Sequence, residues 1–147
     1  MHPAQALGYR CTASGSSNRQ IIYQEITMEE ILLGESEFDL MEIIWERAPI
    51  NSGELVAICD ERFSWKKSTV YKMLRRLSDK NIVKSENSMV DYIVDKKVVQ
   101  KYQSENLVSK SFGGSLSLFV NSFLGDRCLS KEEAQNLIDM IEKHTED

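Results

Sequence analysis

The stretch from residue 66 to residue 94 constrains the fold most, because its hydrophobic period changes once along its length. Up to residue 80, apolar side chains recur every three or four positions, which predicts an amphipathic helix over residues 66 to 80. Residues 82 to 84 and 89 to 94 then form two short strand-like runs, separated by a polar turn over residues 85 to 88. The segment therefore predicts a helix followed at once by a β-hairpin.

The predicted helix has one packing side and one basic side. At 100° per residue its apolar stripe consists of Val70, Met73, Leu74 and Leu77. Residues 66 to 84 hold seven basic and one acidic side chain (net +6), whereas residues 29 to 63 hold two basic and ten acidic ones (net −8). Because nucleic-acid binding depends on where charge is concentrated, this pattern favours a nucleic-acid contact although the whole chain carries −5. The alternative is an ordinary solvated, lysine-rich helix surface.

Two further amphipathic segments precede the basic helix. Ser36 is expected to cap the first, whose core face holds Phe38, Met41, Ile44 and Trp45. Residues 52 to 62 form a second, shorter helix. The order helix, helix, basic helix, hairpin predicts a winged helix-turn-helix, in which the third helix fits the DNA major groove and the hairpin lies along the phosphate backbone.

The candidate DNA-contacting residues follow from this arrangement. One exposed ridge of the third helix carries side chains suited to base edges and phosphates. Lysines at the start of the helix and of the wing are expected to contact phosphates. Tyr71 lies at the margin of the ridge and faces either DNA or the domain itself. The expected DNA-binding set is Lys66, Lys67, Ser68, Thr69, Lys72, Arg75, Arg76 and Lys84.

The C-terminal third of the chain predicts more helices with unusual apolar surface. Residues 115 to 124 are apolar around most of a helical circumference, and a last helix begins at a Ser130-x-x-Glu133 capping box. A chain of this size cannot cover so much apolar surface by itself, so we expect dimerisation. The expected dimerisation residues are Leu116, Phe119, Val120, Phe123, Leu137, Ile138 and Ile141.

These elements predict a mainly α fold with a small β-hairpin (α+β). We expect a flexible extension over residues 1–27, with Met28 as the natural start, a winged helix-turn-helix domain over 28–95 and a helical dimerisation domain over 96–147. The sequence shows neither an apolar run long enough for a membrane-spanning helix nor the pattern of a signal peptide. We therefore expect a cytoplasmic location.

Catalysis and metal binding are disfavoured by the scarcity of suitable side chains. The three cysteines lie far apart, and the two histidines, His2 and His144, lie at opposite ends. The remaining support for an enzyme is carboxylate pairs at helix starts or loops, where negative charge is favourable anyway. We therefore expect no enzyme activity, no cofactor, no metal site and no small-molecule substrate.

Residues 35 to 145 resemble the penicillinase repressor family of bacterial transcriptional regulators. The resemblance rests on the order and spacing of five segments. These are residues 37 to 45 (EFDLMEIIW), 65 to 70 (WKKSTV), 74 to 77 (LRRL) with Lys80, 112 to 116 (FGGSL) and 129 to 133 (LSKEE).

The resemblance implies a homodimer that represses β-lactam resistance genes or related operons from a pseudo-palindromic operator. It also implies relief through a membrane sensor metalloprotease that triggers cleavage in the C-terminal domain. By register, the family's cleavable Asn-Phe bond falls at Ser122-Phe123, where the phenylalanine matches and the asparagine does not. Lys72 stands where the family usually has threonine, and only Cys128 stands near the Cys-x-Cys pattern of the copper-sensing branch. The alternatives are a winged-helix protein-interaction module and a repressor of the same family that answers another signal.

Overall fold

The computed structural model describes residues 31 to 146, so the extension expected at residues 1–27 lies outside the described residues. The chain divides into two compact units after Asn106, and each is considered by itself. The first unit therefore extends beyond residue 95, where the sequence predicts the domain boundary. The reason is that Val99 and Tyr102, beyond that boundary, are buried in the core of the first unit.

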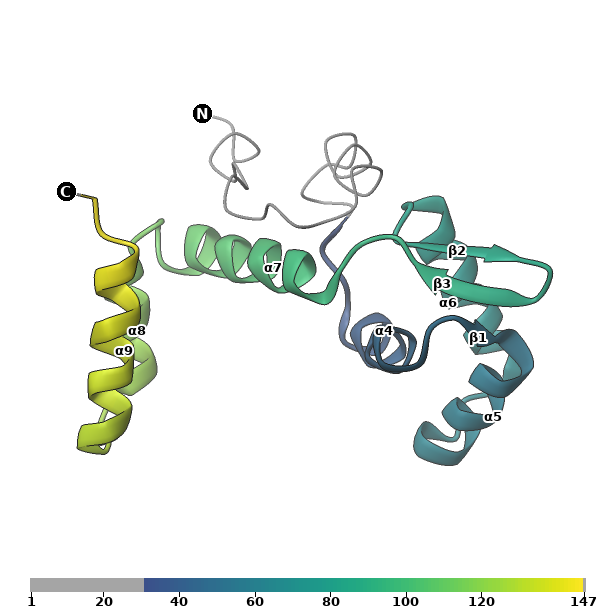
Figure 1. The fold of residues 1–147 in the computed structure, drawn as a ribbon, viewed down its shortest axis with the longest axis horizontal. Helices are drawn as coiled ribbons and strands as arrows, with labels where there is room; N and C mark the ends of the chain where they lie inside the picture. Colours follow the sequence, from purple (N-terminus) through teal and green to yellow (C-terminus); the bar gives the residue numbers. More distant parts are fainter. Residues whose placement is uncertain (1–30, 147) are drawn as a thin grey trace. The chain divides into compact units, whose positions relative to one another are not determined.

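The first unit combines helices with a small antiparallel sheet (Figure 1). Its elements are α4 (Glu35–Arg47), β1 (Ile50–Asn51), α5 (Ser52–Phe63), α6 (Lys67–Asp79), β2 (Val83–Glu86), β3 (Met89–Tyr92) and the first part of α7 (Lys96–Ser111). The strand order is β1-β3-β2, with both pairs antiparallel. This arrangement confirms the predicted fold class, a mainly helical chain with a winged helix-turn-helix.

One hydrophobic core holds these elements together. Helices α4, α5 and α6 pack on one another, while β3 packs on α4 and β2 packs on α6. Trp45 of α4 fixes the end of the hairpin, because its indole Nε1 donates a hydrogen bond of 2.9 Å to the carbonyl oxygen of Val94. The ring of Phe38 meets Trp45 edge-on at 5.5 Å. The wing is thus anchored to α4.

The start of α4 corrects one prediction. Ser36 does not cap this helix, because the N-cap is Gly34 and Ser36 lies exposed within the first turn. Glu37, three residues beyond the cap, accepts a hydrogen bond of 3.0 Å from the backbone N–H of Gly34. A glutamate at this position satisfies an otherwise unpaired N–H at the helix start, so the helix begins earlier than a serine cap predicts.

The hairpin forms as predicted, with a tighter loop. The strands continue to Glu86 and from Met89, which leaves only Asn87 and Ser88 as loop residues. Both have positive φ, 52° and 65°, as a two-residue hairpin turn matched to the twist of the strands requires. Strand β1 was not predicted from the sequence, because two residues are too short to show an alternating pattern.

The second unit contains the end of α7, α8 (Leu116–Leu124) and α9 (Lys131–Lys143). Helix α7 ends at Ser111 and is followed by Gly113 and Gly114, which both have positive φ, and α8 and α9 then run in opposite directions (Figure 1). Ser115 caps α8 and Ser130 caps α9 by accepting the N–H groups of Leu118 and Glu133. No residue between 107 and 146 is buried, so this unit lacks a core of its own within the described chain.

Candidate nucleic-acid interface

The turn between α5 and α6 sets the direction of the basic helix. Ser64 adopts φ 58°, and its N–H donates to the carbonyl oxygen of Asp60. The N–H of Trp65 donates to the carbonyl oxygen of Cys59, so two backbone hydrogen bonds close the end of α5 around the left-handed Ser64. The ring of Trp65 stacks on Phe63 with centroids 4.4 Å apart. The turn is therefore fixed by backbone and aromatic contacts together.

Helix α6 divides into two sides as its sequence predicts. Val70, Met73, Leu74 and Leu77 are all buried and belong to the core. The expected DNA-binding residues are all exposed, on α6, at its N-cap and on the wing: Lys66, Lys67, Ser68, Thr69, Lys72, Arg75, Arg76 and Lys84. Core packing thus holds the helix rigidly while its basic side faces solvent.

The cations of this basic face are available to an external anion. Within residues 31 to 146, the ion pairs are Glu37 with Lys80, Glu42 with Lys96, and Glu105 with Lys101. None of them uses a cation from the expected DNA-binding set. Lys67 lies 5.8 Å from the ring centroid of Tyr71, a cation–π contact that leaves its charge uncompensated.

Tyr71 contacts the domain itself, which is one of the two orientations that the sequence leaves open. Its hydroxyl donates a hydrogen bond of 3.2 Å to Oγ of Ser52, the first residue of α5. Ser52 is the buried polar residue of the described chain, at 7% exposure, and its backbone N–H donates to the carbonyl oxygen of Ser88 at 2.8 Å. The sequence carries no periodic signal for this contact, since it joins α6, α5 and the wing loop through one hydrogen bond between hydroxyls and one backbone hydrogen bond.

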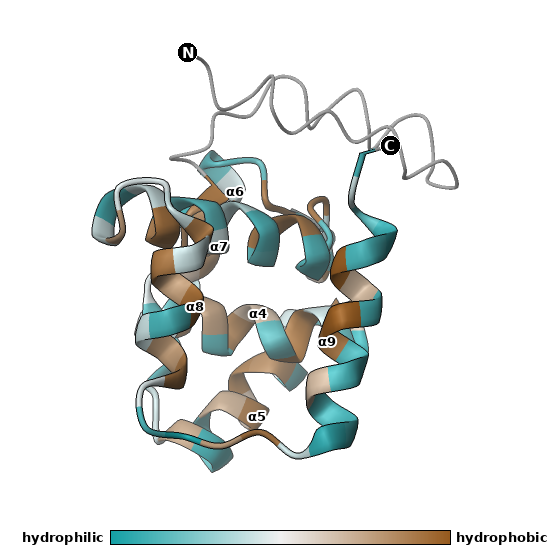
Figure 2. Ribbon diagram, turned by 90° about the vertical axis from the view of Figure 1, so that its left-hand side faces the viewer, coloured by the Kyte–Doolittle hydropathy of each residue, from teal (hydrophilic) through white to brown (hydrophobic). Residues whose placement is uncertain are grey.

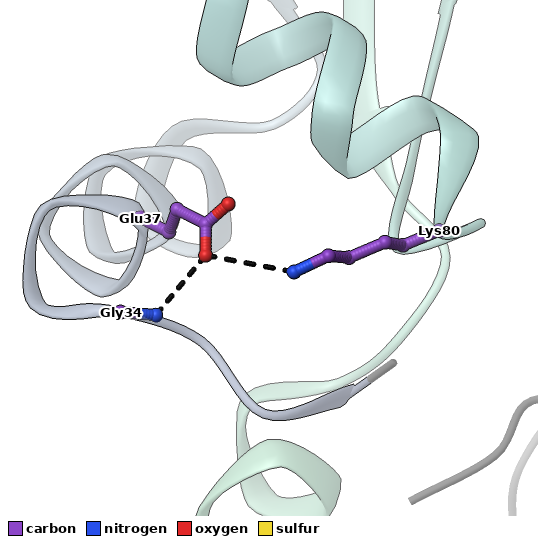
Figure 3. Close-up of polar contacts among 3 residues, drawn as sticks. All are labelled: Gly34, Glu37 and Lys80. Carbon is purple, nitrogen blue, oxygen red and sulfur yellow. Dashed lines mark hydrogen bonds and ion pairs between the residues drawn. The ribbon is translucent and has the colours of Figure 1, made fainter. Parts of the chain in front are cut away.

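Lys80, just after α6, has a structural partner in contrast to the cations of the basic face. Figure 3 shows the carboxylate of Glu37 between two donors, the Gly34 N–H and the Lys80 ammonium. The Lys80 Nζ lies 3.6 Å from Glu37 Oε1, and the Glu37 side chain is only 12% exposed. This contact ties the end of the basic helix to the start of α4.

The second unit exposes the apolar residues that the sequence assigns to dimerisation. Leu116 is 64% exposed, Phe123 59% and Ile141 61%. Apolar residues recur along both α8 and α9 (Figure 2). Phe119 is half-buried, because its ring contacts Phe112 and Phe123. The sequence missed further exposed apolar residues on the same unit: Leu107, Leu118 and Met140.

The Ser122-Phe123 bond lies inside α8, in its last turn before Gly125. The guanidinium of Arg127 lies 5.0 Å from the ring centroid of Phe123. A protease that binds its substrate in an extended form therefore reaches this bond only after the last turn of the helix unwinds.

Metal and thiol chemistry find no support in the described part of the chain. Between residues 31 and 146, no group of three or more His, Cys, Asp or Glu side chains could hold a metal ion. Cys59 is buried, which raises its pKa to about 11, whereas Cys128 is exposed. The helices in this part of the chain are all too short or too polar to span a membrane.

A three-stranded sheet packed with α4, α5 and α6, of which α6 presents a basic face, defines a winged helix-turn-helix protein. The family model described as Penicillinase repressor matches residues 33–143. The chain therefore belongs to the penicillinase repressor family, which confirms the resemblance seen in its sequence.

Individual relatives are similar over most of their length. The chain is 26% identical over 116 residues to the penicillinase repressor of Bacillus licheniformis, which covers 76% of this chain and 91% of that protein. It is 22% identical over 115 residues to the methicillin resistance regulatory protein MecI of Staphylococcus aureus strain N315, covering 76% and 94%. The penicillinase repressor of Staphylococcus aureus is 21% identical over 117 residues, covering 77% and 93%. The family is thus one of repressors.

Proposed function

We propose that this chain represses transcription by binding a pseudo-palindromic operator as a homodimer. The observation that carries the proposal is the basic face of α6, which is exposed, forms no ion pair with residues 31 to 146 and lies on a helix fixed by four core residues. An α-helix with such a face fits the major groove of B-DNA. The alternative of a solvated lysine-rich surface does not account for the adjoining wing, which carries Lys84 on its first strand.

The residues of the basic face divide between two tasks in this proposal. Arg76 and Lys72 suit the O6 and N7 acceptors of guanine, and Thr69 suits a base edge or a thymine methyl group. Lys66 and Lys67 at the start of α6 position the helix by binding phosphates, which carry no sequence information. Lys84 does the same from the wing.

Dimerisation follows from the uncovered apolar surface of the second unit. Each protomer presents the exposed apolar residues of α8 and α9, and a second copy offers the same surface in return. A symmetric dimer places two winged helices on two half-sites, which explains a pseudo-palindromic operator. A winged-helix module that binds a different protein through α8 and α9 is the competing reading.

Relief of repression is proposed to occur by cleavage at Ser122-Phe123, triggered through a membrane sensor metalloprotease. The cut would separate Phe123 and α9 from the rest of the chain and so remove Phe123, Leu137, Ile138 and Ile141 from the apolar surface that is proposed to hold the dimer. Two linked half-sites gain affinity through effective concentration, commonly by about 100-fold or more. A detached winged helix therefore loses at least about 2.7 kcal/mol of operator binding, without any change to α6.

The names of the relatives support β-lactam resistance genes as the regulated targets, since they refer to penicillinase and methicillin resistance. A repressor of the same family that answers another signal would regulate unrelated genes. Binding of the purified protein to promoters of β-lactam resistance genes and to its own promoter, side by side, separates these two targets.

A pair of matched variants on α9 tests the dimer. Ile138 is an apolar residue of α9 and is 49% exposed, and Asn136 is an exposed polar residue of the same helix. Ile138→Glu and Asn136→Glu therefore add the same negative charge to α9, the first at an apolar position and the second at a polar one. We expect Ile138→Glu to be monomeric by analytical ultracentrifugation and to bind operator about 100-fold more weakly. Asn136→Glu should remain a dimer with unchanged affinity. A dimeric Ile138→Glu variant with full affinity would refute the assignment of this surface.

A further inference from the structure

Two elements of the proposed DNA interface meet at one buried residue. The Oγ of Ser52 accepts a hydrogen bond from the Tyr71 hydroxyl on α6, and the backbone N–H of Ser52 donates to Ser88 in the wing loop. The geometry points to Ser52 and Tyr71 as positioning residues that set the wing tip relative to the recognition helix and thereby determine how well operator is discriminated from other DNA. This inference rests on the proposed function.

The position of Ser52 in the fold explains why it can serve both elements. It is the first residue of α5, where backbone N–H groups have no partner within the helix. Its N–H is therefore free to extend the pairing of β1 with β3 by one more bond, beyond Asn51 and Met89. Because Ser52 is 7% exposed, its hydroxyl depends on a protein partner, and Tyr71 supplies it.

The junction restrains parts of the interface that the core does not fix. The hydrophobic core holds the base of the wing through Val83 and Val90, but the loop residues Asn87 and Ser88 are exposed. On α6, Tyr71 is 39% exposed and lies one residue before Lys72. Loss of the Tyr71–Ser52 bond would leave Ser52 joined to the wing loop by its backbone N–H but would release α6 from this junction, so the ring of Tyr71 and the neighbouring Lys67 ammonium could shift relative to the wing loop.

Such movement affects the two kinds of DNA binding differently. Base-edge hydrogen bonds need donor and acceptor within a few tenths of an ångström and a narrow range of angles, so they weaken when α6 and the wing shift. Non-specific binding depends on charge spread along the phosphates and acts over a screening length of about 10 Å, so small shifts change it little. A positioning role therefore lowers the ratio of specific to non-specific affinity. A purely stabilising role lowers the folded fraction, which weakens both kinds of binding equally and leaves the ratio unchanged.

The test measures this ratio for the full chain. The probes are a duplex selected by the wild-type protein from a random pool and a scrambled duplex of the same composition. Tyr71→Phe removes only the hydroxyl and keeps the ring beneath Lys67, while Ser52→Ala removes the acceptor from the other side. Ser104→Ala removes a hydroxyl that donates to the Lys101 carbonyl oxygen within α7, outside the junction, as the matched control for Ser52→Ala. Thermal unfolding of each variant reports whether the fold is retained.

We expect the specific to non-specific ratio to fall about fivefold in Tyr71→Phe and in Ser52→Ala, the equilibrium equivalent of one neutral hydrogen bond. The double variant should show the same fivefold loss as each single variant, since each substitution removes the same bond, and Ser104→Ala should keep the wild-type ratio. An unchanged ratio in both single variants, or losses that multiply in the double variant, would overturn the inference while the proposed function stands. A wild-type protein that binds both duplexes equally would overturn the proposed function and the inference with it.

Discussion

The carboxylate of Glu37 is a point where charge and helix capping can be separated experimentally. Its Oε1 accepts a hydrogen bond of 3.0 Å from the Gly34 N–H and lies 3.6 Å from the Lys80 ammonium. Glu37→Gln keeps an oxygen for Gly34 and removes the charge, whereas Glu37→Ala removes both contacts. Solvent-exposed ion pairs contribute about 0.2 to 1 kcal/mol. Since Glu37 is 12% and Lys80 29% exposed, the upper end of that range applies.

We therefore expect Glu37→Gln to lower the free energy of unfolding by about 1 kcal/mol. Glu37→Ala should lower it by about 2 kcal/mol, because a lost helix-start hydrogen bond adds about 1 kcal/mol. Urea titrations followed by tryptophan fluorescence measure both, because Trp45 lies in the core that unfolds. All variants are compared at one protein concentration, since dimerisation would couple stability to concentration.

A double-mutant cycle with Lys80→Met decides whether the ion pair exists in solution. If it does, either single substitution already breaks the pair. The double variant Glu37→Gln/Lys80→Met should then be at least as stable as whichever single variant has the lower free energy of unfolding. Strictly additive losses would refute the ion pair. Equal losses for Glu37→Gln and Glu37→Ala would refute the capping contact.

Two further predictions concern the interior of the first unit and its thiols. Trp45→Phe removes the donor to the Val94 carbonyl oxygen and some packing, so the free energy of unfolding should fall by about 2 kcal/mol. A loss under about 0.5 kcal/mol would contradict the hydrogen bond between Trp45 and Val94. In a Cys11→Ser background at pH 8, a thiol reagent should label Cys128 quickly and Cys59 only after denaturation. The reason is that burial raises the pKa of Cys59 to about 11, which keeps its thiol protonated. Equal labelling rates of the two cysteines in the native protein would contradict this expectation.

The basic helix could be predicted in detail from the sequence because its signal is local. Val70, Met73, Leu74 and Leu77 lie on one stripe at the helical period, and all four are buried. The capping serine of α9 was likewise predicted, since Ser130 accepts the N–H of Glu133 three residues on. Periodicity and capping depend on near neighbours, so one sequence suffices to find them.

Contacts between distant segments could not be predicted in this way. Strand β1 exists only because Ile50 pairs with Val90, and Ser36 fails as a cap because Gly34 and Glu37 satisfy the helix start instead. The first unit takes in part of α7 because Val99 and Tyr102 find room in its core. The Ser52–Tyr71–Ser88 junction joins three elements by single hydrogen bonds, for which sequence spacing offers no sign.

The salt dependence of operator binding by the full chain tests most directly the claim that a dimer binds DNA through two basic faces. Each protomer offers Lys66, Lys67 and Lys84 to phosphates, so a dimer neutralises about six phosphates, and log K should fall with log salt at a slope of about −5. Titration of a fixed duplex at concentrations well above the dissociation constant should give two protomers per operator. A slope near zero, or saturation at one protomer per tightly bound operator, would contradict the account.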